Sequence, residues 1–367
     1  MTRPDPTVPA RPRRLRAVAL ATAALLSLAG LTACGTDEPA ATGPDGSLNQ
    51  IDLTFTISST SLAHQLVYAA RDGGYLEKYK IKARFVTAES SSVAIAALAS
   101  GSAQVAFVGR TDGLLTTAQG KKMVYAYKHS TGFLTNVTVS KAFADRNPGW
   151  ESKSVEDRLR LLDGATMAQA SANGVLTRVF DDAMASVGGK VKNTYIAVNT
   201  MPTALTRGAV DAYMAPSPFQ ETTVQRGEGV LFVKGTELRA SGGETIVQGA
   251  TVVSQSFLDS DRDTVVRVMA ALQATAEAMK ADPDRAKQLA QDRLKSIDAS
   301  IFDTMWPAAY EVITGPLRHP MSPEDITFMI KHDATNVPAA QTLDPASQIV
   351  PADLLTEAKE LVSRVGF

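Results

Sequence analysis

The chain has one cysteine, Cys34, among 367 residues. A single cysteine forms no disulfide within the chain, so the fold must be stabilised by a packed hydrophobic core. The four histidines show no HExxH or paired spacing, so we expect no metal site. The sequence also lacks a G-x-S-x-G elbow, a P-loop and a dinucleotide-binding motif. These absences predict a protein that is not an enzyme and that uses no cofactor.

Charge and long apolar runs are scarce as well. Charged residues make up 20% of the chain, its formal net charge is −1 and no basic stripe occurs, so nucleic acid is not an expected partner. The apolar run at 17–30 has about fourteen residues, fewer than the roughly 20 that a membrane-spanning helix needs. It follows five arginines, which is the order of an export signal. Loss of residues 1–33 would remove five positive charges and one negative charge, leaving a net charge of −5.

The position of the cysteine supports export. Leu31-Thr32-Ala33-Cys34 resembles the bacterial lipobox, in which small residues precede a cysteine that receives diacylglycerol and becomes the new N-terminus. A lone buried thiol is the alternative, but nothing around Cys34 could bury it. The resemblance implies a signal peptide at 1–33, a lipidated flexible leash at 34–50, and a lipid anchor at the outer face of the cytoplasmic membrane. Arg13-Arg14 leaves the general and the twin-arginine export routes both open.

Strand and helix patterns alternate after the leash. Ile51, Leu53, Phe55 and Ile57 alternate with polar residues, which predicts a strand with one buried face. Further strands are predicted at 80–85 and 105–108, and helices at 62–70 and 93–100. This order predicts parallel strands joined by right-handed crossovers.

The same order returns in the second half of the chain. Strands are predicted at 165–170, 193–198 and 210–215, and helices at 175–187 and 202–207. Two more strands, at 136–139 and 250–254, could carry the chain out of a first lobe and back into it. Beyond residue 254 the apolar spacing of three and four predicts helices.

Two stretches resemble a known family. Gly74-Tyr75-Leu76-Glu77 together with 93–109, which includes VAIAALASG, resembles one block of the solute-binding proteins of ABC importers, and the run A-L-T-R-G-A-V-D-A at 204–212 resembles another. The likeness is to the nitrate, sulfonate, taurine and thiamine-precursor group and covers roughly 51–280. It implies an α/β, two-lobe, type II periplasmic-binding-protein fold, with a mostly parallel sheet flanked by helices in each lobe, two hinge strands and a helical C-terminal extension. Lobe I would comprise 51–135 plus 250–367, and lobe II 136–249.

Two positions depart from the family pattern. Gln104 stands where the family has an aspartate in the first block, which is a surface change of small cost. In the second lobe the family ends a strand with Glu-Pro, whereas Ser217 takes the place of the acid here. Any ligand that the resemblance would assign through that glutamate is therefore in doubt.

Ligands of two-lobe α/β proteins bind at the carboxyl ends of the strands, where helix N-termini direct N–H groups into a cleft. The predicted strands place four polar segments at these ends and one at the crossing between lobes. We therefore expect ligand contacts from Ser58, Ser59, Thr60, Ser61, Arg110, Thr111, Ser130, Thr131, Ser171, Asn173, Gly174 and Ser217. The competing explanation for the serines and threonines is simple helix capping. His64 and His129 could touch ligand, but a structural role is the more common one.

The nature of the solute depends mainly on Arg110. Turned inward, its guanidinium would match the oxygens of a sulfonate, carboxylate or phosphate; turned outward, it would reach a carboxylate such as Asp112. An anionic, alkanesulfonate-like solute is the first prediction. Aromatic residues near the same strand ends, such as Phe107 and Tyr213, leave open a heteroaromatic solute such as a thiamine-pyrimidine precursor.

The sequence thus predicts an exported, monomeric lipoprotein that captures a small solute by lobe closure and delivers it to ABC permease subunits. A sensory or accessory binding protein of the same fold is the alternative from another functional class.

Overall fold

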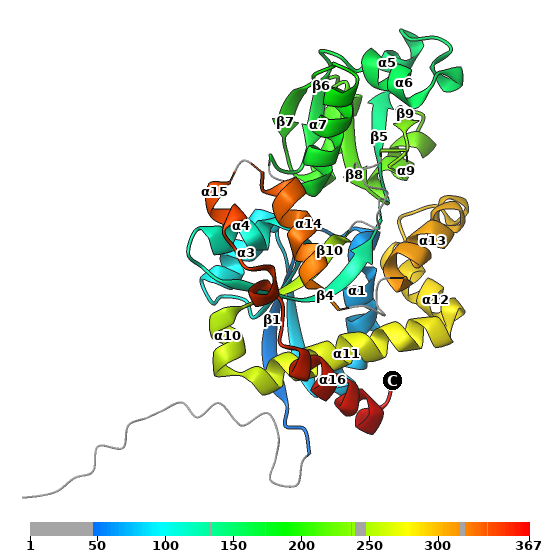
Figure 1. Cartoon of the computed structure of the whole chain (residues 1–367). Coiled ribbons are helices and arrows are strands. Elements are labelled where there is room, and N and C mark those ends of the chain that lie inside the picture. Colours follow the sequence, from blue (N-terminus) through cyan, green and yellow to red (C-terminus); the bar gives the residue numbers. More distant parts are fainter. Residues whose placement is uncertain are drawn as a thin grey trace, which may run out of the picture. The chain divides into compact units, whose positions relative to one another are not determined.

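The computed structural model describes residues 47–132, 134–172, 174–235, 237–238, 247–315, 320–335 and 337–367. The predicted signal peptide, Cys34 and most of the predicted leash lie outside the described residues. Two mixed sheets dominate the described part, each flanked by helices (Figure 1).

The first sheet has the strand order β2-β1-β3-β10-β4. Strands β1 and β2 pair in parallel, as do β1 and β3, whereas β10 runs antiparallel to β3 and β4. The strands are β1 (Ile51–Ile57), β2 (Ile81–Thr87), β3 (Val105–Gly109), β4 (Met123–Thr131) and β10 (Val247–Ser254). The late strand β10 therefore completes a sheet that begins about 200 residues earlier.

The second sheet has the order β7-β6-β8-β5-β9 and repeats this plan. Here β5 is the strand that runs antiparallel to its neighbours, β8 and β9, while β6 pairs in parallel with β7 and β8. The strands are β5 (Thr135–Ser140), β6 (Thr166–Gln169), β7 (Lys192–Tyr195), β8 (Ala212–Pro216) and β9 (Gly229–Val233). The predicted α/β fold with two mostly parallel sheets is confirmed. Sheet membership changes between β4 and β5 and again between β9 and β10, and we keep the predicted lobe boundaries as a proposal on this basis.

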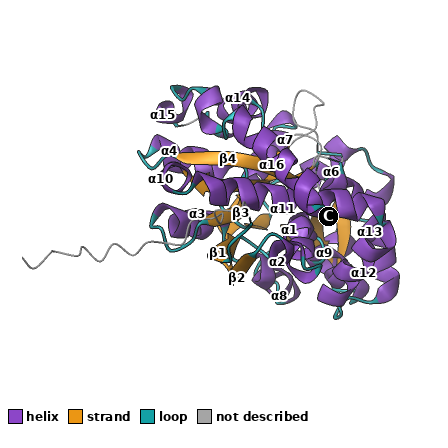
Figure 2. Ribbon diagram, turned by 90° about the horizontal axis from the view of Figure 1, so that it is seen from below, coloured by secondary structure: helices purple, strands orange, loops and turns teal. Residues whose placement is uncertain are grey.

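Helices cover the sheets (Figure 2). The long helix α11 contacts α1, α2 and the C-terminal helix α16, and α13 contacts β4. The described helices are α1 (Gln65–Asp72), α2 (Tyr75–Lys78), α3 (Ser91–Ala99), α4 (Thr111–Ala118), α5 (Lys141–Asp145), α6 (Val155–Leu161), α7 (Val175–Ser186), α8 (Met201–Thr206), α9 (Phe219–Gln225), α10 (Gln255–Ser260), α11 (Arg262–Ala281), α12 (Pro283–Arg293), α13 (Ala299–Thr314), α14 (Pro323–Asp333), α15 (Pro338–Gln341) and α16 (Ala352–Val365). The prediction of helices beyond residue 254 is confirmed.

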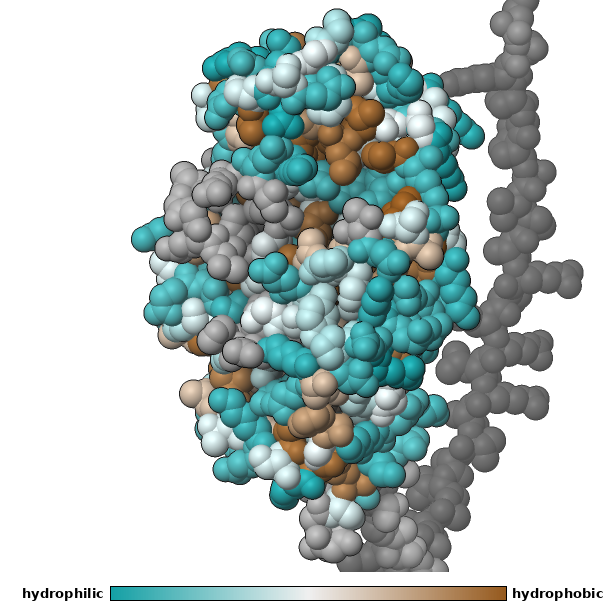
Figure 3. All heavy atoms as spheres, turned by 90° about the vertical axis from the view of Figure 1, so that its right-hand side faces the viewer, coloured by the Kyte–Doolittle hydropathy of each residue, from teal (hydrophilic) through white to brown (hydrophobic). Residues whose placement is uncertain are grey.

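Each sheet has its own hydrophobic core. Phe55, Leu66 and Met269 belong to the core of the first sheet, and Phe180 and Phe232 to that of the second. Full burial of one such side chain stabilises the fold by about 1.5–3 kcal/mol. On the face drawn in Figure 3, hydrophobic residues form separate patches among hydrophilic ones. No helix in the described part of the chain combines the length and hydropathy required to cross a bilayer.

Candidate functional site

A pocket of about 120 Å³ lies between strand ends of the two sheets. The first sheet and its loops contribute Ser58, Ser59, Ser61, Ala63, His64, Glu89, Ser90, Ser91, Gly109, Asp112, Gln248 and Gly249. The second contributes Gln169, Ala170, Ser171, Gly174, Leu176, Thr177, Val198, Met214 and Pro216. Since these residues come from both halves of the chain, closure or opening of the lobes would change the pocket directly.

A second hollow of about 340 Å³ adjoins this pocket and shares Ser58, Ser59, Glu89 and Val198 with it. Thr60, Asn199 and Phe219 are among its other lining residues. The two hollows together provide two adjoining compartments, of about 120 and 340 Å³.

The loop after β1 supplies hydroxyl groups, as the sequence predicts. Ser59 Oγ donates a hydrogen bond to Ser61 Oγ at 3.1 Å, and Ser58 Oγ lies 3.0 Å from His64 Nε2. Thr60 is exposed and lines the second hollow rather than the pocket. The loop is tied to the second sheet, because Leu62 N donates to the carbonyl oxygen of Ser217 at 3.1 Å.

His64 and His129 form a buried pair beside the pocket. The His64 Nδ1 and His129 Nε2 atoms are 2.9 Å apart, so one of the two nitrogens must carry the shared proton. Burial lowers the pKa of His64 to about 3, with the positive charge of Arg293 adding to the effect. Burial and the neighbouring His64 also lower the pKa of His129 well below its usual value. Both rings are therefore neutral near pH 7, and His64 presents a neutral imidazole to the pocket.

The loop after β6 lines the opposite side. Ser171 and Gly174 border the pocket, and the Thr177 hydroxyl in the first turn of α7 donates to the carbonyl oxygen of Ser171 at 2.7 Å. The predicted contact Asn173 lies outside the described residues.

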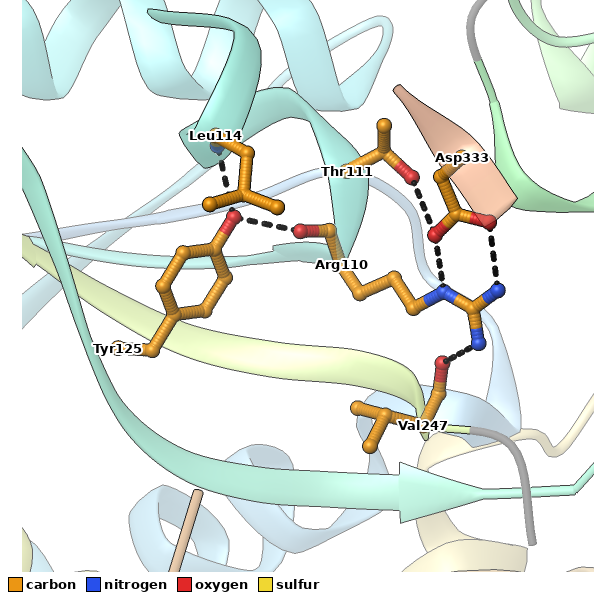
Figure 4. A network of polar contacts seen from close by, with 6 residues as sticks. All are labelled: Arg110, Thr111, Leu114, Tyr125, Val247 and Asp333. Atoms are coloured by element: carbon orange, nitrogen blue, oxygen red, sulfur yellow. Dashed lines mark hydrogen bonds and ion pairs between the residues drawn. The ribbon is translucent and has the colours of Figure 1, made fainter. Parts of the chain in front are cut away.

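Arg110 does not face the pocket. Its Nε and Nη2 atoms donate to the two carboxylate oxygens of Asp333 at 2.5 and 2.7 Å, and Nη1 donates to the carbonyl oxygen of Val247 at 3.0 Å (Figure 4). Thr111 Oγ1 donates to the same carboxylate at 3.2 Å and is fully buried. The prediction that Arg110 and Thr111 contact ligand is corrected accordingly, because Asp333 in α14 takes up the positive charge. The alternative partner named from the sequence, Asp112, is also wrong.

Three further predicted residues are near the crossing between sheets but do not line the pocket. Ser130 and Thr131 are buried at the end of β4. Ser217 is buried at the end of β8, and its hydroxyl donates to Glu221 Oε1 at 2.5 Å. These side chains belong to the packing of the crossing, so their direct ligand contacts are not supported by the geometry.

Several residues that line the pocket were not predicted as ligand contacts from the sequence, among them Glu89, Asp112, Gln169 and Gln248. Asp112 stands in the first turn of α4, a position where an acid is usually explained by the helix dipole. Gln169 and Gln248 stand at the end of β6 and the start of β10, and no turn or cap signal marks them. Within the described ranges there is no cluster of three His, Cys, Asp or Glu residues arranged to hold a metal ion.

Comparisons with known proteins identify the family and the fold of the chain. The model of the NMT1-like family matches residues 47–292, more than half of the chain. The chain belongs to the NMT1-like family. The resemblance drawn from the sequence is thereby confirmed. Comparison with curated protein sequences gives no significant match.

Solved structures share the fold at low sequence identity. The alkanesulfonate-binding protein SsuA from Xanthomonas axonopodis pv. citri, bound to MOPS, is 16% identical with a TM-score of 0.62 over 83% of this chain and 100% of its own. The periplasmic nitrate-binding protein NrtA from Synechocystis PCC 6803 is 12% identical with a TM-score of 0.64, over 85% of this chain and 89% of its own. The aliphatic sulphonate binding protein SsuA from Escherichia coli is 16% identical with a TM-score of 0.58, over 82% and 92%. The printed names of these three neighbours describe binding proteins.

Proposed function

We propose that this protein is the extracytoplasmic solute-binding component of an ABC importer, acting as a monomer that hands a small organic solute to the permease. The observation that carries the proposal is the pocket whose lining comes from strand ends of both sheets. Solute bound there would contact both lobes at once, so binding would favour a closed form that a permease can recognise. Family membership and the functions named for the structural neighbours support the same conclusion.

The class of solute needs revision. The alkanesulfonate prediction depended mainly on Arg110 facing the cleft, and that buried guanidinium instead donates three hydrogen bonds to Asp333 and Val247. Sulfonate and nitrate are named for neighbours of 12–16% identity, a likeness that extends to the fold alone. A sulfonate therefore stays the competing prediction, to be tested beside other classes.

The proposal is tested by mass spectrometry of small molecules released from the purified chain, followed by melting of the stripped protein with each compound found. A true solute at 100 times its Kd adds about 2.7 kcal/mol to the free energy of unfolding. No released compound, and no rise in melting temperature with any released or candidate solute, would count against a solute-binding function.

We also propose that Cys34 carries the lipid anchor and that residues 1–33 are removed on export. The support is the lipobox-like sequence and the apolar run before it. Cys34→Ser should move the protein from the membrane fraction to the soluble fraction after cell lysis. A variant that stays with the membrane would contradict the anchor.

A further inference from the structure

The pocket is acidic in its charged groups. Its described lining contains two carboxylates, Glu89 and Asp112, and neither lysine nor arginine. His64 adds no positive charge at neutral pH, since burial lowers its pKa to about 3. An anionic ligand would therefore meet like charge in this lining and no lysine or arginine of the lining to offset it; Arg293, whose charge acts on His64, is not a lining residue.

Asp112 is the more buried of the two acids. Its side chain lies at the start of α4, is 6% exposed, and accepts a hydrogen bond from Ser92 Oγ at 2.6 Å. Burial raises the pKa of this carboxyl, because removal from water disfavours its charged form. A cation placed beside this carboxylate would stabilise its charged form in place of the water that burial removes.

Gln169 presents an acceptor on the other side of the pocket. Asn193 Nδ2 donates to Asp181 Oδ1 at 3.2 Å, and Gln169 Nε2 donates to Asn193 Oδ1 at 2.9 Å. Asp181 fixes the orientation of the Asn193 amide and, through it, that of the Gln169 amide. The Oε1 atom of Gln169 is therefore the one amide oxygen of this chain of hydrogen bonds without a partner in it. Gln169 is 1% exposed, and no described residue donates to its Oε1 atom.

Gln248, where β10 begins, also has an acceptor without a donor among the described residues. Its Nε2 atom donates to Thr135 Oγ1 at 3.4 Å, and its buried Oε1 atom receives no hydrogen bond from the described residues. Buried acceptors without a donor cost free energy, so two of them in one pocket lining indicate a ligand rich in N–H groups.

We propose that the pocket selects a small organic cation, with an ammonium or amidinium group held by Asp112 and the amide oxygens of Gln169 and Gln248. The proposal rests on the solute-binding function above and assigns its substrate class. The volume of about 120 Å³ suits a group near the size of a six-membered ring, since an apolar cavity of about 150 Å³ holds benzene. The rest of a larger ligand would occupy the adjoining hollow.

Calorimetric titration of the purified full chain with three ligands of one shape tests the charge preference. Benzamidine is a cation, benzamide is neutral and benzenesulfonate is an anion. We expect benzamidine to bind at least ten-fold more tightly than benzamide, and benzenesulfonate to bind more weakly than both.

Asp112→Asn should lower the affinity for benzamidine at least ten-fold and leave that for benzamide within about two-fold, because only the charge changes. Asp145→Asn is the matched control, since that acid is exposed and pairs with Lys141 on α5, away from the pocket lining. If Asp112→Asn does not fold, Gln169→Met tests the same site through its acceptor, with an expected loss of about five-fold.

The outcomes separate the two proposals. Tighter binding of benzenesulfonate than of benzamidine, or an unchanged preference in both pocket variants, overturns the cation proposal and leaves solute binding intact. Failure of all three ligands also overturns it, and the solute-binding function is then decided by the compounds released from the purified protein.

Discussion

Loss of the Arg110 charge should destabilise the fold rather than weaken solute binding. In Arg110→Met, the Asp333 carboxylate stays buried, loses both of its guanidinium hydrogen bonds and keeps only that from Thr111. Arg110 is 1% exposed and Asp333 2%, so solvent screens the pair very little. Removal of one partner from a buried pair costs about 3–5 kcal/mol, and we expect a loss in that range.

The double variant Arg110→Met, Asp333→Leu removes the buried carboxylate together with its partner. Replacement of a whole buried pair by apolar residues is often neutral, so we expect the double variant to be more stable than Arg110→Met alone. Urea unfolding of the wild type, the two single variants and the double variant gives the coupling energy. Arg110 also donates to Val247 at the start of β10, so in the single variant the amides at this end of the strand should be the first to gain hydrogen exchange.

Two results would refute this reasoning. One is additivity, in which the double variant loses the sum of the two single losses. The other is an Arg110→Met protein of unchanged stability that no longer binds its solute, since that would return the arginine to the ligand site predicted from the sequence.

Two further predictions concern the histidine pair. The folded protein keeps His64 neutral down to about pH 3, whereas the unfolded chain binds a proton near pH 6.5, so stability falls as pH drops below 6.5. Between pH 7 and pH 5 this one group should lower the free energy of unfolding by about 2 kcal/mol; His64→Gln should flatten the pH profile, and an equal slope in both proteins would contradict the assignment. Gly249→Ala would place a methyl group against His129 Nε2 and 2.8 Å from Ser130 Oγ, so we expect a loss of about 1–3 kcal/mol in urea unfolding. An unchanged midpoint would show that the contact relaxes freely.

Local sequence patterns are sufficient for much of the fold. Alternation at 51–57 and the continuous apolar run at 105–108 predict β1 and most of β3, because these patterns report burial on one face or on both. The strand at 123–131 escapes prediction because Lys128, His129, Ser130 and Thr131 interrupt its apolar character. These residues are accommodated in a sheet by β10, which arrives more than 100 residues later in the chain.

The candidate site, like the fold, is predicted from the sequence where local patterns define it and missed where distant contacts do. Loops that follow predicted strands could be named from the sequence, and Ser58, Ser59, Ser61, Ser171 and Gly174 do line the pocket. Arg110 could not be assigned in this way, because no local signal identifies Asp333 as its partner 223 residues further on. A charged residue at a strand end can pair with a residue of a distant helix as readily as with a ligand. Only the tertiary contacts distinguish these two roles.

Ser217 shows the converse case, in which a residue type that a motif lacks is present nearby in the structure. Position by position, the chain lacks the acid that the family places before the proline of this strand. In space, Glu221 lies one helical turn further on, accepts hydrogen bonds from Ser217 Oγ at 2.5 Å and from Gln220 Nε2 at 2.9 Å, and is largely buried, which raises the pKa of its carboxyl. Gln220 in turn donates to the carbonyl oxygen of Leu134 and accepts from Asn136 N, where the chain enters the second sheet. A carboxylate therefore does lie beside position 217, held at the crossing between sheets, but Glu221 is not among the residues that line the pocket, so its position alone gives it no contact with solute.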